Sequence, residues 1–215
     1  MDEESESAVG ITDYELVALV DMDVTPQGRR VLGAVGVSDL LDDPTAVRAG
    51  YASLLVRGVA GLDDDGIVAQ GPGAAIGTMV ASADDILLLI LSQDGLEFAR
   101  SVLVDASVGS FLLDQTDYGV HAAQPLEQYT DLLALVHDII DNMADGHGPE
   151  GPFDAAITRH PVDGPDRTVV LHVASRTDWR TEGSDAEGEA AAWRAAVRAL
   201  GRSDAELSSG ARHAH

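Results

Sequence analysis

The sequence predicts an α+β fold: a central antiparallel β-meander covered by helices, with a winged-helix-like N-terminal portion. Residues 84–122 predict the meander, because short apolar stretches alternate there with tight turns. Residues 86–91 (ILLLIL) are apolar on both faces and too short for a helix, which indicates a strand buried on both sides. Asp94-Gly95 then supplies a hairpin turn. Further strands are expected over residues 98–105, 110–113 and 118–122.

Helices are predicted before the meander. Thr12 and Glu15 have the spacing of a capping box, which predicts a helix over 13–22 that residues 25–28 end. A second helix is expected over 29–35. Asp43-Pro44 predicts the next start, with Asp43 as N-cap, and Gly58 stands where this third helix should stop.

The third helix is followed by a predicted hairpin over residues 62–68 and a helix over 72–83. A helix followed by a hairpin resembles the second half of a winged-helix unit. A nucleic-acid binder would carry lysine and arginine on these elements, whereas this stretch sets Arg48 and Arg57 against the aspartates 63–65. The unit is therefore interpreted as a packing module.

After the meander, Pro125 is expected to begin the clearest helix of the chain. Its apolar stripe consists of Leu126, Tyr129, Leu133, Val136, Ile140 and Met143. Strands are expected over 153–159 and 168–175, and residues 177–183 are assigned no element. The capping-box spacing of Ser184 and Glu187 predicts a last helix that Gly201 ends.

The expected organisation has six parts, of which those within 9–201 form one compact unit. They are a disordered acidic tail (1–8), the helical, winged-helix-like portion (9–83), the meander with its covering helix (84–143), a Gly/Pro-rich boundary loop (144–152), a hairpin with a C-terminal helix (153–201) and a frayed tail (202–215).

The charge of the chain limits the classes of partner that it can bind. The chain has 37 acidic and 13 basic residues, all of the latter arginine, and a formal net charge of −24. Lysine-free composition of this kind resembles proteins of high-GC actinobacteria or salt-adapted archaea. The acidic charge disfavours nucleic acid and anionic lipid as partners. With no cysteine, no apolar run of about 20 residues and an acidic N-terminus, we expect a cytoplasmic protein without a membrane partner.

The sharpest chemical motif is the glycine-rich segment 71–77 (GPGAAIG). It follows an apolar pair and opens a helix, and Asp94 stands about twenty residues later, as in a dinucleotide-binding fingerprint. Gly71, Gly73, Gly77 and Asp94 are thus weak candidates for cofactor binding. A loop that enters a helix after a hairpin explains the same glycines, so we expect no cofactor.

No catalytic or metal site is predicted. His137 and Asp141 lie one helical turn apart on an acidic face and are interpreted as surface residues, and His213 and His215 belong to the tail. The aspartate run before Gly66 lacks the glutamate that a calcium loop needs at its twelfth position, where Ala74 stands. The expected function is therefore not enzymatic.

Residues 47–141 resemble the EspG-type chaperones of actinobacterial type VII (ESX) secretion and related uncharacterised proteins. The resemblance rests on the order of parts: segment 47–59 (VRAGYASLLVRGV), the aspartate-rich hairpin and its helix, then the meander and the helix begun by Pro125. It implies an α+β fold with a central antiparallel sheet, and cytoplasmic binding of a helical pair of secretion substrates without catalysis. The segment after Asp141 is short for the second helical subdomain of that family.

We therefore predict a non-enzymatic protein-binding module, such as a secretion-associated chaperone or adaptor with a helical protein partner, that is a monomer or homodimer. Two alternatives stay open. One is a nucleotide-cofactor-binding oxidoreductase that uses the Gly71–Gly77 loop. The other is a winged-helix transcription regulator.

Overall fold

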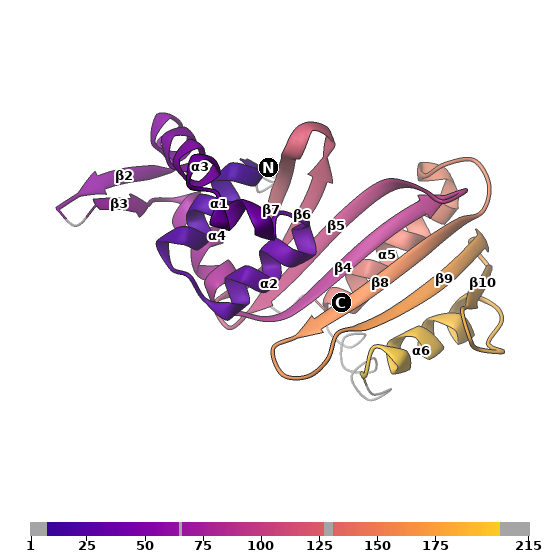
Figure 1. Cartoon of the computed structure of the whole chain (residues 1–215). Coiled ribbons are helices and arrows are strands. Elements are labelled where there is room, and N and C mark those ends of the chain that lie inside the picture. The colour runs from indigo at the N-terminus through magenta and orange to yellow at the C-terminus, as the bar shows by residue number, and fades with distance from the viewer. Residues whose placement is uncertain (1–7, 65, 127–130, 203–215) are drawn as a thin grey trace, which may run out of the picture. The chain divides into compact units, whose positions relative to one another are not determined.

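The computed structural model describes residues 8–64, 66–126 and 131–202, which form a large antiparallel sheet with helices packed around it. Its strands are β1 (Val9–Thr12), β4 (Ala83–Gln93), β5 (Leu96–Ala106), β6 (Gly109–Thr116), β7 (Val120–Leu126), β8 (Phe153–Pro161), β9 (Arg167–Ser175) and β10 (Asp178–Thr181). Their order in the sheet is β1-β7-β6-β5-β4-β8-β9-β10 (Figure 1). The predicted α+β class and its antiparallel sheet are confirmed.

Six α-helices are described. They are α1 (Asp13–Met22), α2 (Pro26–Val35), α3 (Pro44–Val56), α4 (Pro72–Ala81), α5 (Leu132–Asn142) and α6 (Glu189–Ala199). The strands β2 (Ala60–Asp63) and β3 (Gly66–Ala69) form a separate two-stranded sheet. Among the residues that the structure describes, no helix is long and apolar enough to cross a membrane. Most of both predicted tails, together with Asp65 and Tyr129, falls outside the described residues.

The chain divides into two compact units. The first comprises residues 1–86 and 102–128, and the second comprises 87–101 and 129–215. The division passes through β4, between Ile86 and Leu87, and through β5, between Ser101 and Val102. The loop 144–152 lies inside the second unit, and the predicted organisation in six parts stays a prediction.

The first unit begins with the helices that the capping signals predict. Thr12 Oγ1 accepts a hydrogen bond from the Glu15 N–H (3.2 Å), and the Glu15 carboxylate accepts one from the Thr12 N–H (2.9 Å), which confirms the capping box of α1. Asp43 caps α3 by accepting from the Thr45 N–H (2.8 Å), as predicted.

Residues 25–28 do not end α1, as predicted, but begin α2. Thr25 is the N-cap, and its Oγ1 accepts a hydrogen bond from the Gly28 N–H (3.0 Å). Pro26 is the first helical residue, where its missing N–H costs nothing because that donor has no partner within a helix. The sequence correctly indicates a break in helical structure at residues 25–28, but these residues begin α2 and do not end α1.

The strand β4 is not buried uniformly on both faces. Ile86, Leu87, Leu89 and Leu91 are buried, whereas Leu88 and Ile90 are partly exposed. Every residue of the run is apolar, but the exposure of the side chains alternates because one face of β4 is more deeply covered than the other. The prediction that this strand is buried on both faces is therefore wrong.

Pro125 lies in β7 and does not begin a helix. It pairs with Phe111 of β6, and the described pairing of β7 with β1 ends at Ala123 and Val9. Beyond that pair the missing N–H of proline breaks no hydrogen bond to β1, so the strand tolerates it. The covering helix α5 begins later, with Asp131 as N-cap accepting from the Leu133 N–H (3.0 Å).

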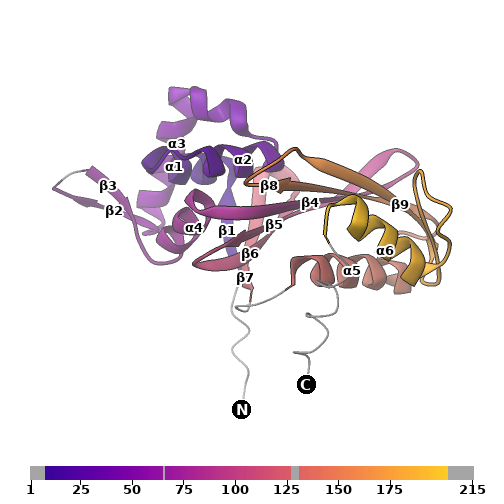
Figure 2. The same ribbon diagram turned by 90° about the horizontal axis from the view of Figure 1, so that it is seen from below.

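In the second unit, α5 and α6 lie on the same side of β8 and β9 (Figure 2). Leu133, Val136 and Ile140 of the predicted apolar stripe are buried. Residues 177–183, which were assigned no element, contain β10 with the fully buried Trp179. The predicted capping box is wrong: Ser184 accepts from the Ala186 N–H within a turn (3.2 Å), and α6 begins after Gly188.

Candidate protein-binding groove

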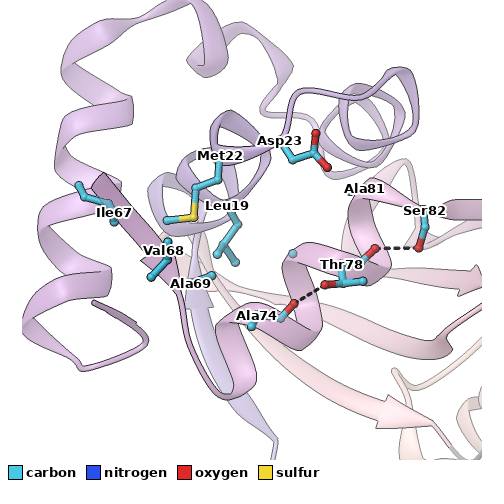
Figure 3. Close-up of a pocket in the computed structure, with 11 residues that line it drawn as sticks. Leu19, Met22, Asp23, Ile67, Val68, Ala69, Ala74, Thr78, Ala81 and Ser82 are labelled. Atoms are coloured by element: carbon cyan, nitrogen blue, oxygen red, sulfur yellow. Dashed lines mark hydrogen bonds between the residues drawn. The ribbon is translucent and has the colours of Figure 1, made fainter. Parts of the chain in front are cut away.

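The first unit carries a groove of about 500 Å³ between α1, β3 and α4. Its lining is mostly apolar (Figure 3). The residues that line it are Leu19, Met22, Asp23, Ile67, Val68, Ala69, Ala74, Gly77, Thr78, Ala81 and Ser82. An open apolar groove of this size is suited to side chains of a partner.

One wall of the groove is the small-residue face of α4. Gly77 and Thr78 lie three and four residues after Ala74, and Ala81 lies four and three residues after them, so the four share a face of the helix. A Cβ added to Gly77 would lie 3.8 Å from the Leu19 side chain of α1. The glycine therefore widens the groove where it meets α1, and the small side chains let a second backbone approach closely.

The hydroxyl groups in this wall are satisfied by their own helix. Thr78 Oγ1 donates to the Ala74 carbonyl (2.8 Å), and Ser82 Oγ donates to the Thr78 carbonyl (2.7 Å), as Figure 3 shows. Thr25 Oγ1 donates to the Ala81 carbonyl (3.0 Å) and ties the start of α2 to the end of α4. These bonds leave few polar groups that need a ligand, so the wall suits apolar contacts.

The opposite side of the groove carries adaptable and acidic groups. Met22 lies at the last turn of α1, and its flexible thioether can fit different partner side chains. Asp23 is exposed and is the only charged residue among those that line the groove. The β2–β3 hairpin, which supplies Ile67 and Val68, also carries the exposed Asp63 and Asp64.

The helix α1 is held in place by a buried carboxylate. Glu15 is fully buried and accepts hydrogen bonds from Ser53 Oγ (2.6 Å), Arg57 Nη1 (2.6 Å) and the Thr12 N–H. Burial by itself would raise the pKa of Glu15, but the hydrogen bonds from Ser53, Thr12 and Arg57 together with the arginine charge lower it. Glu15 therefore joins α1 to α3 as a carboxylate.

A second link between α1 and α3 lies near the groove end of α1. The Tyr51 hydroxyl donates to Asp21 Oδ2 (2.8 Å). Burial of the ring, together with this bond and the aspartate charge, raises the pKa of Tyr51. The two links fix the helix that presents Leu19 and Met22, so the groove is formed before any partner arrives.

The glycine-rich candidates are not assembled into a cofactor site. Gly71 is the N-cap of α4 with φ +51°, and Gly73 packs against Val59, where a Cβ would lie 2.6 Å from the carbonyl oxygen. Gly77 lines the groove, whereas Asp94 stands at the β4–β5 turn and belongs to the other unit. The strand before α4 and the strand after it lie in different sheets, so the βαβ unit of a dinucleotide fingerprint is not formed.

His137 is not the surface residue that the sequence suggested. Its ring lies 5.3 Å from the ring of Trp179 and 5.1 Å from that of Trp193, and its Nε2 is 2.9 Å from Glu189 Oε1. It therefore helps to pack α5, β10 and α6 together. Among the described residues no group of three or more His, Asp or Glu side chains could hold a metal ion.

Sequence reasoning missed most of the groove. The sequence predicts a helix that contains Leu19 and Met22 and a hairpin that contains Ile67 and Val68, without a binding role for these residues. The signal for the groove in the sequence is the spacing of small residues at 74, 77, 78 and 81. The sequence analysis considered only segment 71–77, as a dinucleotide fingerprint or as a loop that enters a helix.

Two comparisons with known proteins found no match. No protein-family profile matches the chain, and no curated protein matches it. The proposals below therefore depend on the geometry of the chain and on the resemblance described above.

Proposed function

We propose that this chain is a non-enzymatic protein-binding module that holds a helical segment of a partner protein in the groove between α1, β3 and α4. The observation that carries the proposal is an open apolar groove with a wall of small residues and polar groups already satisfied. An amphipathic helix that enters such a groove uses apolar residues at positions i, i+3 or i+4, and i+7.

The charge of the module indicates the polar side of that helix. Asp23 lines the groove, Asp63 and Asp64 lie on the neighbouring hairpin, and the whole chain has a net charge of −24. A partner helix with lysine or arginine beside its apolar face would be attracted, and an acidic helix would be repelled. The groove thus selects an apolar, basic-flanked helix.

We further propose that the module is a secretion-associated chaperone or adaptor. The support is the order of parts over residues 47–141, which resembles the EspG-type chaperones. A chaperone needs a preformed apolar surface that covers a substrate segment without reacting with it, and the groove meets this need. The cofactor alternative has less support because no βαβ unit is formed, and the regulator alternative has less support because the hairpin is acidic.

The proposal can be tested by photo-cross-linking. The photoreactive residue p-benzoylphenylalanine would replace Thr78, an exposed groove residue, and in a matched variant Ala75, an exposed residue of the same helix that does not line the groove. Both proteins would be expressed and irradiated in cells of the natural source. Mass spectrometry would identify any attached peptide.

We expect a protein adduct at position 78 and much less at position 75, with the attached peptide lying in an amphipathic helix. Equal adducts at both positions would indicate random collision, and the proposal would then be wrong. The same would hold if irradiation gave no protein adduct at position 78, or if that position became attached to nucleic acid.

A further inference from the structure

Tyr118 occupies a conformation that costs free energy, although its side chain is exposed and adds little to the packing of the described residues. Its side chain is 99% exposed, and its backbone has φ 72° and ψ 21°. A residue with a Cβ in this left-handed region is strained by about 1 kcal/mol, and glycine or asparagine would suit the position better. Thr116 Oγ1 donates to the Val120 carbonyl and closes the turn without the tyrosine ring. The strain therefore points to a role outside the fold.

The turn that carries Tyr118 lies beside the start of α1. Val120 pairs with Thr12, and a Cβ added to Gly119 would collide with the Asp13 carboxylate. Tyr14, the next residue of α1, is 47% exposed, and Val120 is 39% exposed. All these residues belong to the first unit, and they lie at the opposite end of α1 from the groove.

The Asp13 carboxylate at this surface is held in a fixed position. Its Oδ1 lies 2.6 Å from Nε2 of His121, whose side chain is 1% exposed, while the Asp13 side chain is 25% exposed. A partly exposed carboxylate anchored by a buried imidazole keeps its place without a ligand. Its Oδ2 lies against Gly119. An apolar partner would remove water from the exposed part of this charged group and give it no new hydrogen bond, which is costly.

We propose that Tyr14, Tyr118 and the Asp13 carboxylate form a second recognition surface, which binds an arginine- or lysine-bearing segment of a partner protein. A guanidinium or ammonium group can contact an exposed tyrosine ring through a cation–π interaction and pair with the carboxylate. The net charge of −24 attracts such a segment over a longer range. Arginine fits best because its planar group stacks on aromatic rings.

The test uses the full chain labelled with ¹⁵N and two synthetic peptides, acetyl-Arg-Gly-Arg-Gly-Arg-amide and its glutamine counterpart. Amide resonances would be followed by NMR during titration at low and at moderate salt. Tyr118→Gly removes the ring in a residue type that suits the turn, and Phe98→Ser is the control at an exposed aromatic of the other unit. The melting temperature of each variant reports folding.

We expect saturable shifts centred on Tyr14, Tyr118 and Val120 with the arginine peptide and none there with the glutamine peptide. Tyr118→Gly should weaken binding about threefold or more, as expected for loss of an exposed cation–π contact, while its melting temperature stays equal or rises. Phe98→Ser should leave binding unchanged. Shifts spread evenly over all acidic residues, or unchanged affinity in Tyr118→Gly, would overturn the proposal. Neither result would affect the groove, which Thr78 tests separately.

Discussion

At the scale of single residues, Gly50 decides how closely α1 and α3 pack. A Cβ at this position would overlap the Tyr14 carbonyl and lie 2.7 Å from the Ala18 Cβ. Gly50→Ala should therefore force the helices apart and lower the free energy of unfolding by about 2 kcal/mol, the usual cost of overpacking. Reversible urea denaturation measures this change.

The matched control is Gly33→Ala in α2, where nothing lies within 4 Å of an added Cβ. There the substitution should raise the free energy of unfolding by up to about 1 kcal/mol, because alanine is the better helix former. If both variants were equally stable, the close approach of α1 and α3 would be wrong.

Glu15 gives a second test at this scale, through pH. Its pKa is lowered in the folded protein, so the stability it contributes is fully present above its unfolded value near 4.5 and is lost as the pH falls through the lower folded value. Glu15→Gln should cost about 2 kcal/mol at pH 7, since Arg57 and Ser53 lose a charged acceptor.

The stability difference between wild type and Glu15→Gln should therefore shrink as the pH falls below about 4.5. Chemical denaturation at several pH values between 3 and 7 measures it, and the difference cancels the titration of the other carboxylates. A difference that stayed constant over this range would show that Glu15 does not contribute as an anchored carboxylate.

At the scale of elements, the alternation along β4 can be tested with adjacent residues. Leu89 is 1% exposed, whereas its neighbour Leu88 is partly exposed. Leu89→Ala should cost about 3 kcal/mol because it removes buried methyl groups and leaves a cavity, and Leu88→Ala should cost about 1 kcal/mol. Thermal and urea unfolding of the two variants would separate these values. Equal losses would support the original interpretation of a strand buried on both faces.

The elements also show what local sequence can predict. Two helix starts with a side-chain cap, Thr12 in α1 and Asp43 in α3, were predicted, because the cap is a contact within three residues. The caps Thr25 of α2 and Asp131 of α5 were missed. Pro125 and Ser184 were misplaced because strand pairing with β6 and the burial of Trp179 override a local signal. The groove was missed for the same reason: it needs α1, β3 and α4 together, and no local pattern places them side by side.

At the scale of the whole molecule, the excess of negative charge has the main influence on the stability of the folded state. Several arginines form ion pairs with nearby carboxylates, for example Arg100 with Glu97 (2.8 Å) and Arg176 with Asp141 (2.9 Å). If each of the 13 arginines were matched with one carboxylate, an excess of 24 would remain. Repulsion among these charges should weaken the folded state at low ionic strength.

We therefore expect the melting temperature to be higher at about 0.5 M sodium chloride than at very low salt, since the Debye length falls from about 30 Å at 0.01 M to less than 8 Å above 0.15 M. Circular dichroism at several salt concentrations near pH 7 measures it. A melting temperature that fell with added salt would mean that local ion pairs outweigh the repulsion.

Binding of a partner helix in the groove between α1, β3 and α4 is tested by the affinity of that helix for three proteins. The segment attached at position 78 would be synthesised and titrated by calorimetry into wild type, Ala74→Trp and Ala75→Trp. Ala74 lines the groove, whereas Ala75 is exposed on the same helix outside it. We predict binding weakened about tenfold or more in Ala74→Trp, a loss of about 1.4 kcal/mol, and little changed in Ala75→Trp. Equal affinity of Ala74→Trp and wild type would contradict the account.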